Sequence, residues 1–234
     1  MSEIKVGYQT TERPEHAATP ANANEYLIRQ ILSRTNTCTL VKVLKVTNEG
    51  GVEPVGFVDI QILVHQLDGF GNAVPHGTIY HIPYVRIQGG TDAVIIDPKV
   101  GDIGIALFAQ HDISSVKANK GPANPGSFRR FDHSDALYLG GVLNGTPEQY
   151  IQYSNGGIKI LSPTAVIIEA PNVTVNADAV TVNAPGVTIN ADNGVDINSP
   201  TVTCSGDVIA SGKSLVHHTH GGVTSGSGNT GQPN

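Results

Sequence analysis

The chain has 234 residues, a formal net charge of -6 at pH 7 and only 15% charged residues. This balance argues against nucleic-acid binding, because a nucleic-acid-binding face needs Lys and Arg to displace the counterions of the phosphates. Aromatic residues make up 5% of the chain, whereas 39% of its residues are hydrophobic, many of them Val and Ile. That composition favours β-structure.

The N-terminal region, residues 1–36, is predicted to contain an extended arm and a helix. Residues 1–21 are polar and include Pro14 and Pro20. The first residues lack the long apolar stretch of a signal peptide, and no apolar run approaches the roughly 20 residues of a membrane-spanning helix. We therefore expect a protein that is made in the cytoplasm and carries no signal peptide.

The helix is expected over residues 22–35. Asn22 can accept a hydrogen bond at its N-terminus, and Glu25 stands three residues later, as in a capping box. Four apolar residues recur at helical spacing: Leu27, Ile28, Ile31 and Leu32. Such a stripe packs against its own domain more often than it binds a partner, and both interpretations stay open at this point.

Residues 37–143 are predicted to form a small β-barrel of the OB type, because several short strands are separated by glycine-containing turns. Between residues 58 and 64, apolar and polar residues alternate, which indicates a half-buried strand with Val58, Ile60, Ile62 and Val64 on one face. Further strands are expected at Thr39–Val46, Thr78–Ile87, Ala93–Ile96, Asp102–Ala109 and Ala136–Leu139. Residues 119–131 contain two Pro and two Gly and are expected to form a long loop.

From Ile158 the chain becomes a repeat, and residues 144–205 are predicted to form a shaft. Pairs of apolar residues separated by one position start every seven or eight residues, with Asn, Ala, Asp, Pro, Ser and Gly between the pairs. Each unit is therefore a strand of three residues and a corner, with both apolar side chains on one face. The shaft-core residues are Val173, Val175, Val180, Val182, Val187, Ile189, Val195, Ile197 and Val202.

The period of this repeat is too short for the chain to enclose a core alone. A coiled coil is excluded, because Pro163, Pro171, Pro185 and Pro200 interrupt the segment and the apolar spacing is i, i+2. A single-chain β-helix needs about 18 to 25 residues per coil, so this segment would form little more than two coils. Three intertwined chains, each giving one strand per layer, would direct every apolar pair at a shared axis. We expect a homotrimeric, triple-stranded β-helix.

The C-terminal region, residues 206–234, is predicted to be a metal-binding tip. His218 and His220 stand two positions apart, so on a strand they would share one face while His217 would point outward. Threefold symmetry would bring six imidazoles together, a set that suits an octahedral ion such as iron or nickel better than tetrahedral zinc. The competing interpretation is a solvated, glycine-rich tail, because a His-x-His pair alone is a weak signal.

The tip sequence resembles the iron-binding apex of central spike proteins from contractile-tailed phages with short spikes. The resemblance is carried by the run from His218 to Val223 and by Gly228–Pro233, preceded by Gly206–Val208 and Gly212. In this family His-x-His holds one iron at the trimer axis, which implies an octahedral iron bound by His218 and His220 of three chains.

The base of the chain is similar to the OB-fold domain of the same family. The similar segments are Pro98–Gly104, Asp112 with the following Ile, and Arg129–Ala136. The resemblance implies that the OB domain joins the baseplate hub and the β-helix forms the shaft. It also implies that the spike, in the virion at the tip of the tail baseplate, pierces the bacterial outer membrane as the tail contracts.

Three other functions compete with this one. An enzyme on a β-helix would need paired carboxylates or a basic array in a groove, and the few charged residues after Gly157 are dispersed. A receptor-binding fibre would be expected to end in a broad head with exposed aromatics rather than a narrow glycine-rich tip. The spike of a phage-derived injection system, such as a tailocin or a secretion-like machine, cannot be distinguished from a phage spike by these residues.

Overall fold

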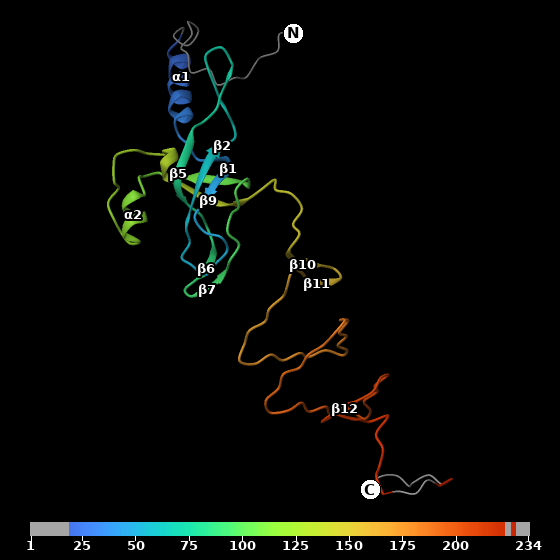
Figure 1. Cartoon of the computed structure of the whole chain (residues 1–234). Helices are drawn as coiled ribbons and strands as arrows, with labels where there is room; N and C mark the ends of the chain where they lie inside the picture. Colours follow the sequence, from blue (N-terminus) through green and yellow to red (C-terminus); the bar gives the residue numbers. More distant parts are fainter. Residues whose placement is uncertain (1–18, 223–225, 228–234) are drawn as a thin grey trace, which may run out of the picture. The chain divides into compact units, whose positions relative to one another are not determined.

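The computed structural model describes residues 19–222, 226 and 227, and contacts divide the chain into two units, Met1–Ile167 and Ile168–Asn234. The described residues form a mostly β structure with few short helices (Figure 1), which is compatible with the predicted all-β class. Within the described ranges no helix is long and apolar enough to cross a membrane.

Helix α1 spans Pro20–Ser33 and starts two residues earlier than predicted. Its cap is Thr19, whose hydroxyl accepts from the backbone N–H of Asn22 at 3.2 Å, and Pro20 follows because a proline is tolerated in the first helical turn. The prediction that Asn22 is the cap was therefore wrong. The apolar stripe of α1 is largely exposed: its four residues are between 55% and 64% exposed.

Five strands, each antiparallel to its neighbours, form the main sheet in the order β5-β2-β1-β8-β9. Their bounds are β5 Thr78–Pro83, β2 Phe57–Ile62, β1 Cys38–Val46, β8 Ile103–Phe108 and β9 Ala136–Gly141. A parallel bridge joins Tyr84 to Tyr138, and the N–H of Val85 donates to the carbonyl of Tyr138 at 2.9 Å. The two edge strands therefore meet and the sheet curls on itself, which is compatible with a small barrel.

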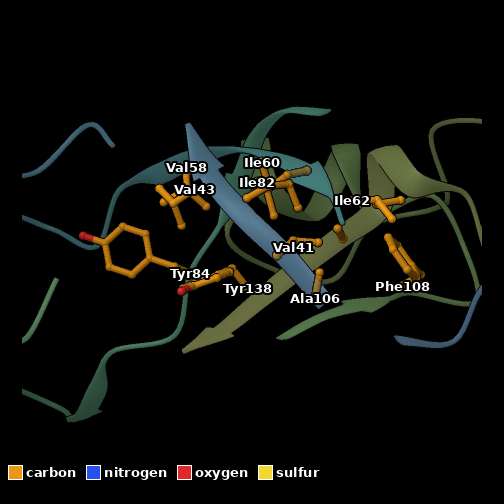
Figure 2. Packing of buried hydrophobic residues seen from close by; sticks show 11 residues of the cluster. Val41, Val43, Val58, Ile60, Ile62, Ile82, Tyr84, Ala106, Phe108 and Tyr138 are labelled. Carbon is orange, nitrogen blue, oxygen red and sulfur yellow. The ribbon is translucent and has the colours of Figure 1, made fainter. Parts of the chain in front are cut away.

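The core lies inside this curled sheet, and Figure 2 shows its side chains gathered around β1. Val58, Ile60 and Ile62 are at most 4% exposed, as the alternation predicted. Val64 is 62% exposed, contrary to the prediction, because β2 ends at Ile62. Gly104 allows a close approach in the core: a Cβ there would clash with the Tyr138 ring and with the Gly140 carbonyl oxygen.

Several short elements surround the sheet. The expected strand 78–87 is two strands, because β5 ends at Pro83, which has no N–H to continue the ladder. The strand Asp92–Val94 lies close to the expected strand Ala93–Ile96, and the strand Gly157–Leu161 contains the expected apolar pair Ile158 and Ile160. Helix α2 and the hairpin at residues 66–74 were not predicted, because so few residues do not show a period. The short elements are β3 Gln66–Leu67, β4 Ala73–Val74, β6 Ile87–Gly89, β7 Asp92–Val94, α2 Ser114–Asn119, the 3-10 helix His133–Asp135, β10 Tyr150–Ser154 and β11 Gly157–Leu161.

An ionic cluster joins distant parts of the long segment between β8 and β9 to one another. Asp135 is fully buried and accepts from Arg129 Nε at 2.6 Å and from the N–H of Ile113 at 3.0 Å. Asp112 accepts from another nitrogen of Arg129 at 2.8 Å and from the Ser127 hydroxyl. The hydrogen bonds of Asp135 raise the pKa of Arg129, so the guanidinium stays charged between the two carboxylates.

A second ion pair, which is buried, joins the segment between β5 and β6 to the segment after β7. Arg86 and Asp97 have side chains that are 3% exposed and lie 2.6 Å apart. The Tyr84 hydroxyl donates to the same carboxylate at 2.8 Å, and the N–H of Gly50 donates to its other oxygen. Burial would raise the pKa of Asp97, but the hydrogen bonds from Arg86 and Tyr84 outweigh burial and lower it.

Candidate metal-binding apex and shaft

The apex begins with a tight hairpin directly before the histidines. Strands β12 (Ile209–Ala210) and β13 (Lys213–Ser214) pair through a two-residue turn in which Ser211 and Gly212 have φ of 50° and 76°. Two positive φ values are typical of a type I′ turn, whose twist matches that of the flanking strands. The hairpin is extended by a hydrogen bond from the N–H of Leu215 to the carbonyl of Val208 at 2.8 Å.

The two predicted metal ligands lie together just after this hairpin. The ring centroids of His218 and His220 are 4.9 Å apart, and the rings meet edge to face at 75°. Residues 215–217 form a turn and residues 218–220 lie outside any strand, so the expected strand does not bring the rings together. The turn places them side by side instead, while His217 is tied by its backbone N–H to the Ser214 hydroxyl at 2.7 Å.

One of the two histidines has its tautomer fixed by the backbone. His218 Nδ1 lies 3.1 Å from the carbonyl oxygen of Ser214 and 3.0 Å from that of Leu215. Carbonyl oxygens only accept, so Nδ1 carries the hydrogen and the lone pair of the neutral ring is on Nε2. Metal-binding histidines usually donate their other ring N–H in this way. The donor chemistry of His218 therefore fits a transition metal.

A single chain supplies too few ligands to enclose an ion. Among the described residues, no group of three or more His, Cys, Asp or Glu side chains could hold a metal. His218 and His220 are both exposed. An iron site built on them would therefore need donors from outside this chain.

The shaft-core residues are all exposed in the single chain, by between 56% and 69%. Residues 162–208, every one of which is described, lie in no helix or strand. Between residues 162 and 205 the only backbone hydrogen bond is the local one from Gly194 to Ala191. Between residues 162 and 205 the repeat thus leaves its apolar side chains exposed and most of its backbone polar groups without a partner within one chain, because each extended segment has no neighbouring strand.

Two further residues of the apex take part in its geometry, and the sequence alone did not indicate them. Asp207 accepts from the N–H of Val216 at 3.1 Å, and Ser214 contacts both Asp207 and the backbone of His217. Neither residue belongs to a periodic pattern, and their separation of seven positions has meaning only once the hairpin is formed. The similarity of Gly206–Val208 to the family apex was the one signal that could have indicated them.

Comparison with known protein families gives one match. A family described as the GpV Apex motif matches residues 214–234, which are 21 of the 234 residues and include both histidines. A search of curated proteins finds no match. The matched segment begins within the hairpin that positions His218. The apex match supports a central spike protein of a phage baseplate, with a structural role at the tip of the tail.

Proposed function

We propose that this chain is the cell-puncturing spike at the tip of a contractile tail and acts as a homotrimer. The observation that carries the proposal is the position of the apex motif. It follows, after one short hairpin, on a repeat of seven or eight residues whose nine shaft-core residues are all exposed in one chain. A spike needs both parts, because a stiff shaft transmits force and a narrow tip concentrates it.

A trimeric shaft would give partners to the backbone groups, and cover the apolar side chains, that one chain leaves exposed. If three chains intertwine over residues 144–205, each three-residue strand gains neighbours for its N–H and C=O groups. The nine shaft-core residues then turn from solvent to a common axis. Closed interchain ladders leave no free edges along the rod, which suppresses lateral aggregation. Each unit would advance the rod by about 4.8 Å, the spacing of paired strands.

Iron is the metal that we assign to the apex, held by His218 and His220 of three chains. Six imidazoles suit an octahedral ion and leave no open position for catalysis. The bound ion would join the three C-terminal segments into one closed point. The chain itself supplies the free Nε2 of His218, through the backbone carbonyls that fix its tautomer.

We assign the rest of the chain a role in attaching the spike to the baseplate, not in catalysis. Residues 37–143 would form the OB-type base that binds the baseplate hub, and the ionic clusters of Arg129 and Arg86 stiffen it. Contraction of the tail sheath would drive the whole rod through the bacterial outer membrane as a preformed object. The action is mechanical, and we assign no enzymatic activity to the chain.

The test is the mass and metal content of the purified full-length protein. We expect a trimer with one iron for every three chains. Replacing both His218 and His220 with Ala should remove the metal and leave the trimer intact. His217→Ala is the matched control and should retain the metal, since the His217 backbone, not its ring, makes the described contact. A folded monomer, or full metal retention in the double variant, would contradict the proposal.

A further inference from the structure

The apex hairpin contains a small polar network in front of the histidines, formed by Asp207, Ser214 and the turn after β13. Ser214 is its centre. Within residues 163–222, all of which are described, Ser214 is the one residue that is not exposed. Ser214 is covered through its own contacts, which are the hydrogen bond with Asp207 and the one from the N–H of His217.

The carboxylate of Asp207 closes the open end of the hairpin. It accepts from the backbone N–H of Val216 at 3.1 Å. The hydrogen bond from the Ser214 side chain, then the one from Val216, lower the pKa of Asp207, so the group is ionised near neutral pH. An ionised carboxylate accepts hydrogen bonds more strongly than a neutral group does. Asp207 thereby links the strand before the turn to the residues that lead to the histidines.

Ser214 connects Asp207 to the histidines through both its side chain and its backbone carbonyl. Its hydroxyl has one hydrogen, which is donated to Asp207, and its oxygen accepts from the N–H of His217 at 2.7 Å. Its backbone carbonyl, with that of Leu215, accepts from His218 Nδ1. The side chain thus fixes the turn, and the main chain fixes the ring and its tautomer.

We propose that Asp207 and Ser214 are positioning residues that pre-organise His218 as a metal ligand through Nε2. The inference rests on the proposed function, because it assumes that the apex binds a metal. His220 makes no comparable backbone hydrogen bond within the described part of the chain. The network therefore orients one of the two ligands before the metal binds and leaves the other to adjust to it.

The network should raise metal affinity because it reduces the entropic cost of ordering an exposed turn when the metal binds. Without the network, residues 215–218 would lose backbone and ring freedom only when the metal binds, which weakens affinity. Loss of partners that orient a ligating histidine typically reduces metal affinity by about 10- to 100-fold. We expect the lower end of that range, because the network is close to solvent and water can replace part of it.

The experiment measures Fe²⁺ affinity of the full-length protein by competition with a chelator, alongside amide hydrogen exchange of the metal-free protein. Asp207→Ala and Ser214→Ala should each weaken Fe²⁺ binding about 10-fold and speed exchange at Val216 and His217. Asp178→Ala, which removes an exposed carboxylate from the shaft, is the matched control and should change neither quantity. Asp207→Asn keeps an acceptor oxygen and should lie between the parent and Asp207→Ala.

The outcomes separate this inference from the proposed function. Asp207 and Ser214 act through one network, so the double variant should bind Fe²⁺ within about threefold of the weaker single variant. Parental Fe²⁺ affinity in Asp207→Ala with faster exchange would mean that the network is only structural and would overturn the inference. The inference would also be overturned if the loss of Fe²⁺ affinity in the double variant equalled the product of the losses in the two single variants. If instead the double His218 and His220 variant keeps its metal, the proposed metal site itself is wrong.

Discussion

Replacing Val180 with Asp is the most direct test of which face of the repeat is buried. Val180 is 67% exposed in the single chain, so about two thirds of its side chain remains to be covered by other chains. Full burial of a valine contributes roughly 1.5–3 kcal/mol, so covering the rest contributes about 1–2 kcal/mol per chain. Val180→Asp forfeits this contribution three times in a trimer.

The introduced charge adds a larger cost. A carboxylate on a dry axis would be neutralised rather than kept charged. Neutralising an ordinary aspartate at pH 7 costs about 4 kcal/mol. With the lost burial this makes about 5–6 kcal/mol per chain and about 15–18 kcal/mol per trimer, which reaches or exceeds the upper end of the net stability of a folded domain. We therefore expect Val180→Asp to abolish the trimer at pH 7.

Thr181→Asp is the control, because the neighbouring side chain points to the opposite face of an extended segment. Sedimentation equilibrium and resistance to heat would be measured for both variants. Thr181→Asp should remain trimeric and heat-resistant. Acidification to about pH 4 should partly restore the Val180→Asp trimer, since protonation then removes the buried charge at little cost. Equal behaviour of the two variants, or a stable Val180→Asp trimer at pH 7, would refute the assignment of faces.

The remaining predictions concern the base and the independence of the shaft. Asp135→Ala should lower the free energy of unfolding of the base by about 3–5 kcal/mol in urea titrations, because it leaves Arg129 and a backbone N–H with fewer partners, whereas exposed Asp92→Ala should change it by less than about 0.5 kcal/mol. The pKa of Asp112 is lowered to about 2, first by its hydrogen bonds with Ser114. The contribution of ionised Asp112 to the free energy of unfolding is complete above the ordinary aspartate pKa and is lost as pH falls through about 2. In Asp112→Asn the free energy of unfolding should therefore fall less steeply as the pH is lowered. Residues 144–234 alone should form a heat-resistant trimer, and an unfolded fragment beside a trimeric full chain would show that the shaft is not autonomous.

Local patterns were sufficient to predict most of the main sheet. β1, β2, β8 and β9 appear close to their expected bounds, because alternation along a strand reports directly which face is buried. The helix at Pro20–Ser33 was also expected, although its cap was misassigned: Asn22 and Thr19 have similar capping chemistry, and the choice depends on where the chain turns. The seven-residue repeat, the two histidines and the apex motif are likewise properties of the sequence itself.

Tertiary structure decided the features that depend on residues distant in the chain. Nothing in the spacing of Asp112, Arg129 and Asp135 indicates that they converge, because the loop between them has no period. The closure of the sheet through Tyr84 and Tyr138 is equally nonlocal. At the apex the sequence predicted His218 as a ligand, but only the folded hairpin brings the Ser214 carbonyl within 3.1 Å of His218 Nδ1 and fixes the tautomer of the ring. A sequence pattern records which side chains avoid water, whereas the direction of a hydrogen bond is set only when the chain has folded.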